Sequence, residues 1–307
     1  MPTPSFHRDL RAAPLVPRTV VGPRSLRAVR LLTRALATTR RRWGAVEAPV
    51  APGVSVRLFR PSSGPPRTPA LLWMHSGGLV IGAARQDDRA CRRFADRLGI
   101  AVASVEYRLA PEHPFPTALH DCLAALRWLA GRPFVDPERI AVGGESAGGG
   151  LAAALALLAR ERDEVRPVLQ LLSYPMLDDR TAARTDVDQR CVRLWNANSN
   201  RFGWRSYLGP AWRTDDVPPL AAPARHPDLS GLPPAWIGVG TCDLFHDEDV
   251  AYAQRLRQSG TGCTLHVVPG AYHLFDGVEP WAPVSREFLR ARTAALAEAL
   301  GRGDRAG

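Results

Sequence analysis

Short apolar runs alternate with longer segments of helical periodicity along most of this chain. Such runs are typical of strands buried on both faces, and the amphipathic segments between them are typical of covering helices. Strands that alternate with helices predict an α/β fold with a mostly parallel sheet covered on both sides. The predicted strands are residues 54–59, 70–74, 100–105, 139–142, 168–172, 235–239 and 264–268, and the predicted helices are residues 86–98, 117–129, 147–160, 247–258 and 283–299.

The alternation breaks at residues 179–215, which are polar and rich in arginine and aromatic side chains. We interpret this segment as an insertion over the carboxyl ends of the strands, where sheets of this kind bind ligands. Trp195 and Trp204 lie within it and are candidates for lining an acyl or alcohol pocket. They could equally form the core of the insertion itself.

The N-terminal segment also departs from the alternation. Leu26, Val29, Leu32 and Leu36 recur at helical spacing within residues 25–43, and arginines occupy the other face. This pattern predicts an amphipathic helix folded onto the body of the protein.

A length of 307 residues fits one large domain with an added lobe. We expect a core made of residues 46–178 and 216–307, with a cap insertion at residues 179–215. A basic helical arm at residues 1–45 is expected to form part of this cap.

The net charge of +10 is concentrated at one end of the chain. All 40 basic residues are arginine, and the first 50 residues hold ten of them against Asp9 and Glu47, so this segment carries +8. A basic segment on a nearly neutral body differs from a groove lined by basic and stacking aromatic residues. We therefore expect no nucleic-acid partner, and we attribute the absence of lysine to a GC-rich genome.

Cysteine usage and hydropathy indicate a protein of a reducing compartment. The five cysteines are odd in number and contain no C-x-x-C pair, which argues against a disulfide framework and a thiolate zinc site. The longest apolar run, residues 151–159, is too short to span a bilayer, and arginines interrupt every candidate signal sequence. We expect a cytoplasmic protein without a membrane span.

A candidate nucleophile lies between a predicted strand and a predicted helix. Gly144, Ser146 and Gly148 match the pattern G-x-S-x-G, in which a tight turn lifts the serine hydroxyl clear of the sheet. The neighbours two positions away must be small because the turn leaves no space for side chains. The alternative is a glycine-rich phosphate loop, but no G-K-[ST] follows.

A serine hydroxyl needs a base, and in this type of fold the order is Ser, then Asp or Glu, then His. His273 follows the last predicted strand, whereas the other downstream histidines lie within a strand, at a helix start or in an earlier loop. Asp243 comes shortly after the strand at 235–239 and is the candidate that orients the imidazole. Asp247 and Glu248 compete with it, but both fall in the next helix and are expected to face solvent.

A candidate oxyanion hole follows the strand at 70–74. His75, Ser76, Gly77 and Gly78 resemble the HGGG motif of lipases and esterases, in which backbone amides bind the tetrahedral oxygen. The expected donors are the amides of Gly77 and Gly78, with that of Ala147 from the serine turn.

Together these motifs resemble the hormone-sensitive-lipase-like family of α/β-hydrolase esterases. The resemblance covers roughly residues 72–273, and the motifs that carry it are residues 75–78, 107–112, 114–116 and 144–149 with the Asp243 and His273 segments. It implies an eight-stranded, mostly parallel sheet with a helical cap, and hydrolysis of short- to medium-chain carboxylic esters without a metal or cofactor. It also implies a Ser146, Asp243 and His273 triad acting on a small-molecule ester. Family members often dimerise, and the sequence leaves the possibility of a homodimer open.

Ser76 departs from the family pattern, because the first glycine of the motif is usual there. We expect a change in loop stiffness without loss of the two donor glycines. Tyr107 and Glu112 are expected to support the pocket, and Glu145 to point away from the nucleophile.

Three other functions are compatible with these sequence features. An amidase, carbamate hydrolase or deacetylase would share the triad, since leaving-group preference depends on pocket shape. A ligand receptor on this fold, like the plant gibberellin receptors, loses the catalytic histidine, whereas His273 is present here. A membrane-surface protein would use the basic N-terminal segment.

Overall fold

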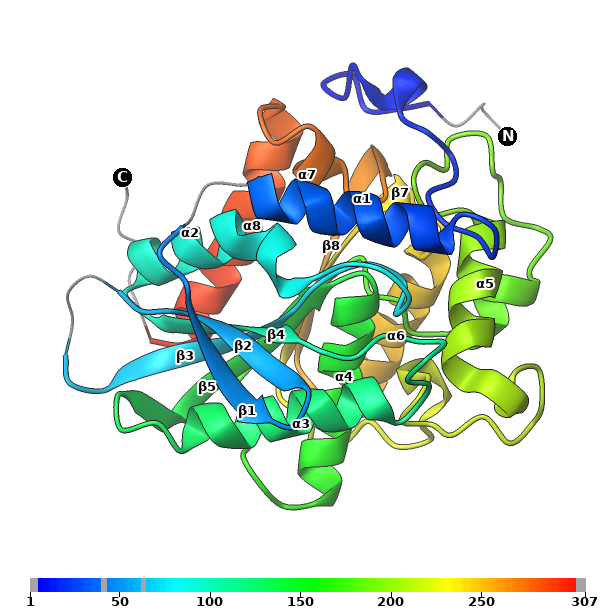
Figure 1. The fold of residues 1–307 in the computed structure, drawn as a ribbon. Coiled ribbons are helices and arrows are strands. Elements are labelled where there is room, and N and C mark those ends of the chain that lie inside the picture. The colour runs from blue at the N-terminus through cyan, green and yellow to red at the C-terminus, as the bar shows by residue number, and fades with distance from the viewer. Residues whose placement is uncertain (1–4, 40–42, 62–64, 302–307) are drawn as a thin grey trace.

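The computed structural model describes residues 5–39, 43–61 and 65–301, and its centre is one eight-stranded sheet (Figure 1). The strand order is β1-β2-β4-β3-β5-β6-β7-β8. β2 pairs antiparallel with β1 and β4, and all other neighbours are parallel. The predicted mostly parallel sheet is therefore confirmed. The strands are β1 Val46–Ala51, β2 Val54–Phe59, β3 Thr68–Met74, β4 Ala101–Glu106, β5 Val135–Glu145, β6 Gln170–Ser173, β7 Ala235–Cys242 and β8 Cys263–Tyr272.

Helices cover both faces of the sheet, as the alternating pattern predicts. The helices are α1 Leu26–Thr39, α2 Asp88–Leu98, α3 Thr117–Ala130, α4 Ala147–Glu161, α5 Ala197–Leu208, α6 His246–Gln258, α7 Phe275–Val278 and α8 Pro283–Ala299. Successive residues of β3 point to opposite faces. Leu72 and Met74 join the core under α3, α4 and α6, whereas Leu71 and Trp73 join the core under α2 and α8.

The sequence pattern does not predict β1, α5 or the short helix α7. β1 is largely exposed, so it lacks the apolar run that reveals the central strands. Its Pro49 is compatible with a position at the sheet edge, where fewer backbone amides need a partner. α5 lies inside the insertion and begins after Asn196, whose side chain caps the helix by accepting from the amides of Asn198 and Ser199.

α1 confirms a helix in the N-terminal segment, and the expected packing face is confirmed for Leu26 and Val29 but not for Leu32. Leu26 and Val29 are half-buried, whereas Leu32 is 60% exposed. Arg30 turns toward the body instead, and its guanidinium donates to the carbonyls of Val80 and Ala110, both at 2.7 Å. Charged donors satisfy these half-buried carbonyls better than an aliphatic side chain can. The end of the predicted helix, at residues 40–42, lies outside the described residues, as do residues 1–4 of the predicted arm.

Hydrogen bonds join the N-terminal segment to residues 179–215. Arg193 Nε donates to the carbonyl of Ala13 at 2.9 Å, and the Ser199 hydroxyl donates to the carbonyl of Val21 at 2.8 Å. Figure 1 shows the N-terminal loop reaching the α5 side of the molecule. In the described residues, no helix combines the length and apolar character that a bilayer span requires.

Candidate active site

The turn between β5 and α4 holds Ser146 in a strained conformation. Its φ is 55° and its ψ is −119°, values that non-glycine residues rarely adopt. A Cβ on Gly144 would lie 2.4 Å from the carbonyl carbon of Gly148, and a Cβ on Gly148 would lie 2.1 Å from the carbonyl oxygen of Met74. Both distances are far below van der Waals contact. The small residues of the motif are therefore a steric requirement of the turn against the end of β3.

The structure brings Ser146, His273 and Asp243 into one hydrogen-bonded chain. His273 Nε2 lies 3.0 Å from Ser146 Oγ, and His273 Nδ1 lies 2.7 Å from Asp243 Oδ2. The three residues follow β5, β8 and β7, whose carboxyl ends meet at one rim of the sheet. In the tautomer with the proton on Nδ1, the imidazole donates to Asp243 and accepts from the serine hydroxyl.

Asp243 and His273 have little freedom to move. The Asp243 side chain is fully buried, and its second oxygen accepts from the amide of Phe245 at 2.9 Å. The imidazole contacts two aromatic rings edge-on, with ring centroids 5.0 Å from Tyr174 and 5.3 Å from Phe245. The ring orientation is thus set by packing as well as by the carboxylate.

A buried ionic cluster lies behind the serine turn. Arg292 of α8 donates to Glu145 at 2.6 Å and to the hydroxyl of Ser173 at 3.2 Å. Tyr174 donates to Asp276 at 2.8 Å, and Asp276 lies 3.9 Å from Arg292. Burial raises the pKa of Glu145, although the Arg292 charge opposes this shift. Glu145 is therefore held in this cluster, as expected for a residue that points away from the nucleophile.

Sequence reasoning did not identify Arg292 as part of the site. A signal existed, because Arg292 lies between Phe288 and Leu296 at four-residue spacing and so shares the buried stripe of α8. A charged residue in an apolar stripe needs a buried partner.

The loop after β3 carries the candidate oxyanion donors. Gly77 and Gly78 have φ values of 137° and 57°, in the region that favours glycine. The amides of Gly77, Gly78 and Ala147 donate to no other residue in the part of the chain that the structure describes. All three N–H groups therefore remain able to donate to a ligand.

Neighbouring side chains contact the loop that follows β3 and hold its backbone in place. The Tyr107 hydroxyl donates to the carbonyl of His75 at 2.8 Å, and the two rings stack with centroids 4.1 Å apart. Burial lowers the pKa of His75 to about 4, so its ring is neutral at physiological pH. Gln86 donates to the hydroxyl of Ser76 at 2.9 Å, a contact that a glycine at this position cannot make.

A cavity of about 230 Å³ opens on the candidate nucleophile. Ser146, His273 and Gly77 line it, together with Val20 of the N-terminal segment and Trp195 of the insertion. Both segments outside the sheet therefore shape this space.

The two candidate tryptophans occupy different places. The Trp195 ring packs directly on Gly78, where an added Cβ would lie 1.8 Å from a ring carbon. Trp204 does not line the cavity; it is only 1% exposed and packs beside Tyr207. A substrate contact for Trp204 stays a prediction, whereas its burial favours a role in the core of the insertion.

The carboxyls after Asp243 differ from expectation. Asp247 is exposed, as predicted, but Glu248 is buried and accepts from the amides of Leu177 and Asp178 at 2.7 and 3.1 Å. The next residue, Asp249, is fully buried, and neither carboxylate oxygen has a partner among the described residues. Burial raises the pKa of Asp249 well above its ordinary value, and the charges of Glu248 and Asp243 add to the effect.

In the described ranges, no group of three or more His, Cys, Asp and Glu side chains is arranged to hold a metal ion. The arrangement can instead move a proton between a hydroxyl, an imidazole and a bound molecule.

Replacing Gly148 with alanine tests the steric requirement of the turn. We expect G148A to lose about 2–3 kcal/mol of unfolding free energy, because the new methyl group collides with the Met74 carbonyl. The control is G277A, where nothing lies within 4 Å of the new Cβ. Urea denaturation followed by circular dichroism measures both variants. A G148A midpoint equal to that of the unmodified protein would contradict the steric argument.

Asp249→Asn tests the buried carboxyl after the site. The folded-state pKa lies above the unfolded value near 3.8, so the native protein retains a proton that the unfolded chain releases. Stability from this group is present below pH 4 and is lost as the pH rises toward the folded pKa. The variant's unfolding free energy, measured relative to that of the unmodified protein, should therefore rise by more than about 1 kcal/mol from pH 5 to pH 9. One pH unit between the folded and unfolded pKa values corresponds to about 1.4 kcal/mol.

Urea unfolding at the two pH values measures this difference, with the exposed Asp215→Asn as the control. A stability difference that does not change with pH would show that Asp249 ionises normally.

Comparison with known proteins identifies the family of this chain. A family model described as the α/β hydrolase fold matches residues 71–277. The chain is 37% identical to the ethyl acetate hydrolase of Pseudomonas putida over 226 residues, which cover 72% of this chain and 70% of that protein. It is 36% identical to esterase LipI of Mycobacterium tuberculosis over 253 residues, with 79% and 77% coverage. The solved structure of a bacterial heroin esterase aligns with a TM-score of 0.88 at 36% identity, covering 96% of this chain and 98% of that one. The chain therefore belongs to the hormone-sensitive-lipase-like branch of the α/β-hydrolase fold family and is an ester-hydrolysing enzyme.

Proposed function

We propose that this enzyme is a serine carboxylesterase in which Ser146 is the nucleophile, His273 the base and Asp243 the residue that orients the base. The observation that carries the proposal is the position of His273, 3.0 Å from Ser146 Oγ and 2.7 Å from Asp243 Oδ2. A hydroxyl is a weak nucleophile until a base within hydrogen-bond distance can accept its proton.

In the first half of the proposed reaction, Ser146 Oγ attacks the ester carbonyl carbon and its proton moves to His273 Nε2. The electron pair of the C=O bond moves onto the oxygen, which accepts from the amides of Gly77, Gly78 and Ala147. The carbonyl then re-forms, the bond to the alcohol oxygen breaks, and the alcohol leaves with the proton from His273. The acyl group remains on Ser146.

In the second half, water attacks the acyl carbon while His273 accepts its proton. The tetrahedral intermediate collapses, the bond to Ser146 Oγ breaks, and the serine recovers its proton from His273. Asp243 stabilises the imidazolium in both halves and keeps the proton on Nδ1. The chain's own side chains and amides handle every proton and charge, so the proposal requires no cofactor or metal.

We further propose that the substrates are esters of short- to medium-chain acids. The cavity at Ser146, of about 230 Å³, is smaller than the roughly 300–1,000 Å³ that is usual for sites of drug-sized ligands, which favours a small acyl group. The similarity to an ethyl acetate hydrolase supports a small ester.

The cap hypothesis also belongs to this proposal. Residues 1–45 and 179–215 would form one cap over the core of residues 46–178 and 216–307. Two observations support this division: Arg193 donates to the carbonyl of Ala13, and Val20 and Trp195 line the same cavity.

Ser146→Ala tests the assignment of the nucleophile. We expect kcat for p-nitrophenyl butyrate to fall by about 10⁴–10⁶, since the attacking oxygen is removed. Asp243→Asn should lower kcat by about 10⁴, because it favours the wrong imidazole tautomer. Steady-state assays and circular dichroism on the same samples distinguish lost chemistry from lost fold.

Ser285→Ala is the matched control, since this serine is also buried but lies on α8, away from the cavity lining. It should retain full activity. If S146A kept more than a tenth of the activity while folded, Ser146 would not be the nucleophile.

The acyl-chain preference tests the proposed substrate size. We expect kcat/KM for p-nitrophenyl butyrate to exceed that for the laurate by at least about tenfold, because a chain longer than the cavity leaves methylenes without a pocket. Leu194 lines this cavity, so Leu194→Ala should narrow the difference by adding space. Equal values for both esters in the unmodified enzyme would contradict the size limit.

A further inference from the structure

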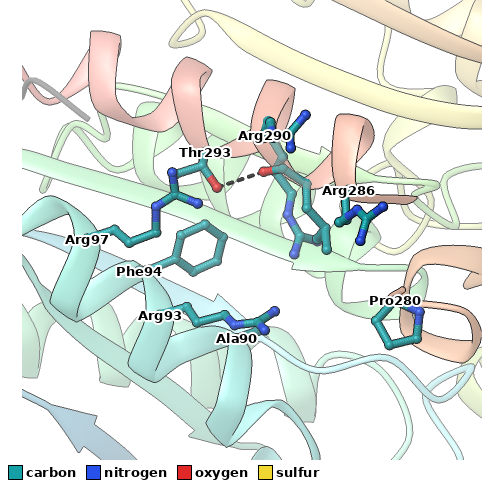
Figure 2. Close-up of a pocket in the computed structure, with 10 residues that line it drawn as sticks. Ala90, Arg93, Phe94, Arg97, Pro280, Arg286, Arg290 and Thr293 are labelled. Carbon is teal, nitrogen blue, oxygen red and sulfur yellow. Dashed lines mark hydrogen bonds between the residues drawn. The ribbon is translucent and has the colours of Figure 1, made fainter. Parts of the chain in front are cut away.

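A second cavity, of about 380 Å³, lies between α2 and α8 (Figure 2). It shares no lining residue with the cavity at Ser146. Figure 2 shows the two helices side by side, with arginine side chains from both helices around the space between them. The five arginines that line it are Arg93, Arg97, Arg286, Arg290 and Arg292.

The positive charge around this cavity is not balanced by its own lining. None of the ten described lining residues is acidic. Arg93, Arg286 and Arg290 are exposed and form no ion pair with any residue in the described ranges, although many other arginines are paired, such as Arg127 with Glu164. Burial lowers the pKa of Arg93, and the charges of Arg89 and Arg97 lower it further. Like charges held this close favour a bound anion.

The lining of the cavity also has an apolar part. Phe94 is 3% exposed and lies between the arginines of α2, and Leu289 and Pro280 line the cavity on the side of α8. A ligand with an apolar body as well as an anionic group would contact both parts of the lining. The volume lies within the range of about 300–1,000 Å³ that is usual for small-molecule sites.

We propose that the cavity between α2 and α8 binds a phosphomonoester, with the phosphate among Arg93, Arg286 and Arg290 and the organic part against Phe94 and Leu289. Three guanidinium groups can each donate two hydrogen bonds, which matches the three terminal oxygens and the charge of nearly −2 of a phosphomonoester. A carboxylate offers only two oxygens and one charge to the same three groups.

Arg292 is buried, unlike Arg93, Arg286 and Arg290, and it connects this site to the serine turn. Its Nη1 is held by Glu145, the residue before Ser146, and its Nε has no hydrogen-bond partner in the described part of the chain. Variants that test the site should leave Arg292 in place, because its removal would leave Glu145 buried and unpaired.

Isothermal titration of the full chain with phenyl phosphate tests the proposal, with phenol as the uncharged comparison. The variant Arg93→Gln with Arg290→Gln removes two exposed arginines, one from each helix. We expect it to raise the Kd for phenyl phosphate by at least about 30-fold, because charge-assisted hydrogen bonds are lost. The matched control, Arg201→Gln with Arg205→Gln, removes the same charge from the exposed face of α5 and should leave the Kd unchanged.

Circular dichroism and esterase activity, both expected to be unchanged, show that the double variant is folded. Vesicles of phosphatidylcholine with and without phosphatidic acid distinguish a soluble phosphomonoester from a lipid headgroup. Binding of phosphatidic acid alone, lost in the Arg93 and Arg290 variant, would support the site with a lipid as its source. The proposal is overturned if neither probe binds, or if binding is the same in the double variant and the control.

Discussion

The hydrogen-bonded chain from Asp243 through His273 to Ser146 depends on how closely three strand ends approach one another. β5, β7 and β8 are parallel and separated only by β6, so the residues that follow them emerge at one rim of the sheet. A shift of about 1 Å at any of these ends would break a hydrogen bond of 2.7 or 3.0 Å. Much of the surrounding structure can be understood as maintaining this geometry.

Two kinds of support act on the serine turn. On the side of β3, the carbonyl of Met74 occupies the space that any side chain at Gly148 would need. The turn therefore packs against the candidate oxyanion loop, which follows Met74. On the side of α8, the pairing of Glu145 with Arg292 attaches the end of β5 to this helix. The contact at Met74 therefore positions the candidate nucleophile relative to the candidate oxyanion donors.

The sequence predicts the parts of the candidate site that local pattern determines. Ser146 lies in a motif whose glycines are required because a side chain at either position would collide with the backbone. His273 and Asp243 each follow a recognisable buried strand. The central strands and their covering helices could be predicted for the same reason, because burial on both faces leaves a continuous apolar run.

Features that depend on tertiary contacts could not be predicted in this way. β1 is an exposed edge strand without an apolar run. The orientation of α1 depends on carbonyls from distant loops that Arg30 satisfies, and the burial of Glu248 depends on the amides of Leu177 and Asp178. Arg292 is more than a hundred residues from Glu145, its partner, so no local spacing joins them.

The most direct test of this account is a crystal structure of the enzyme inactivated by an alkyl phosphonate ester. The account predicts phosphorus bonded to Ser146 Oγ, with its phosphoryl oxygen accepting from the amides of Gly77, Gly78 and Ala147, and His273 still paired with Asp243. An adduct on another serine, or a phosphoryl oxygen directed away from these amides, would contradict it.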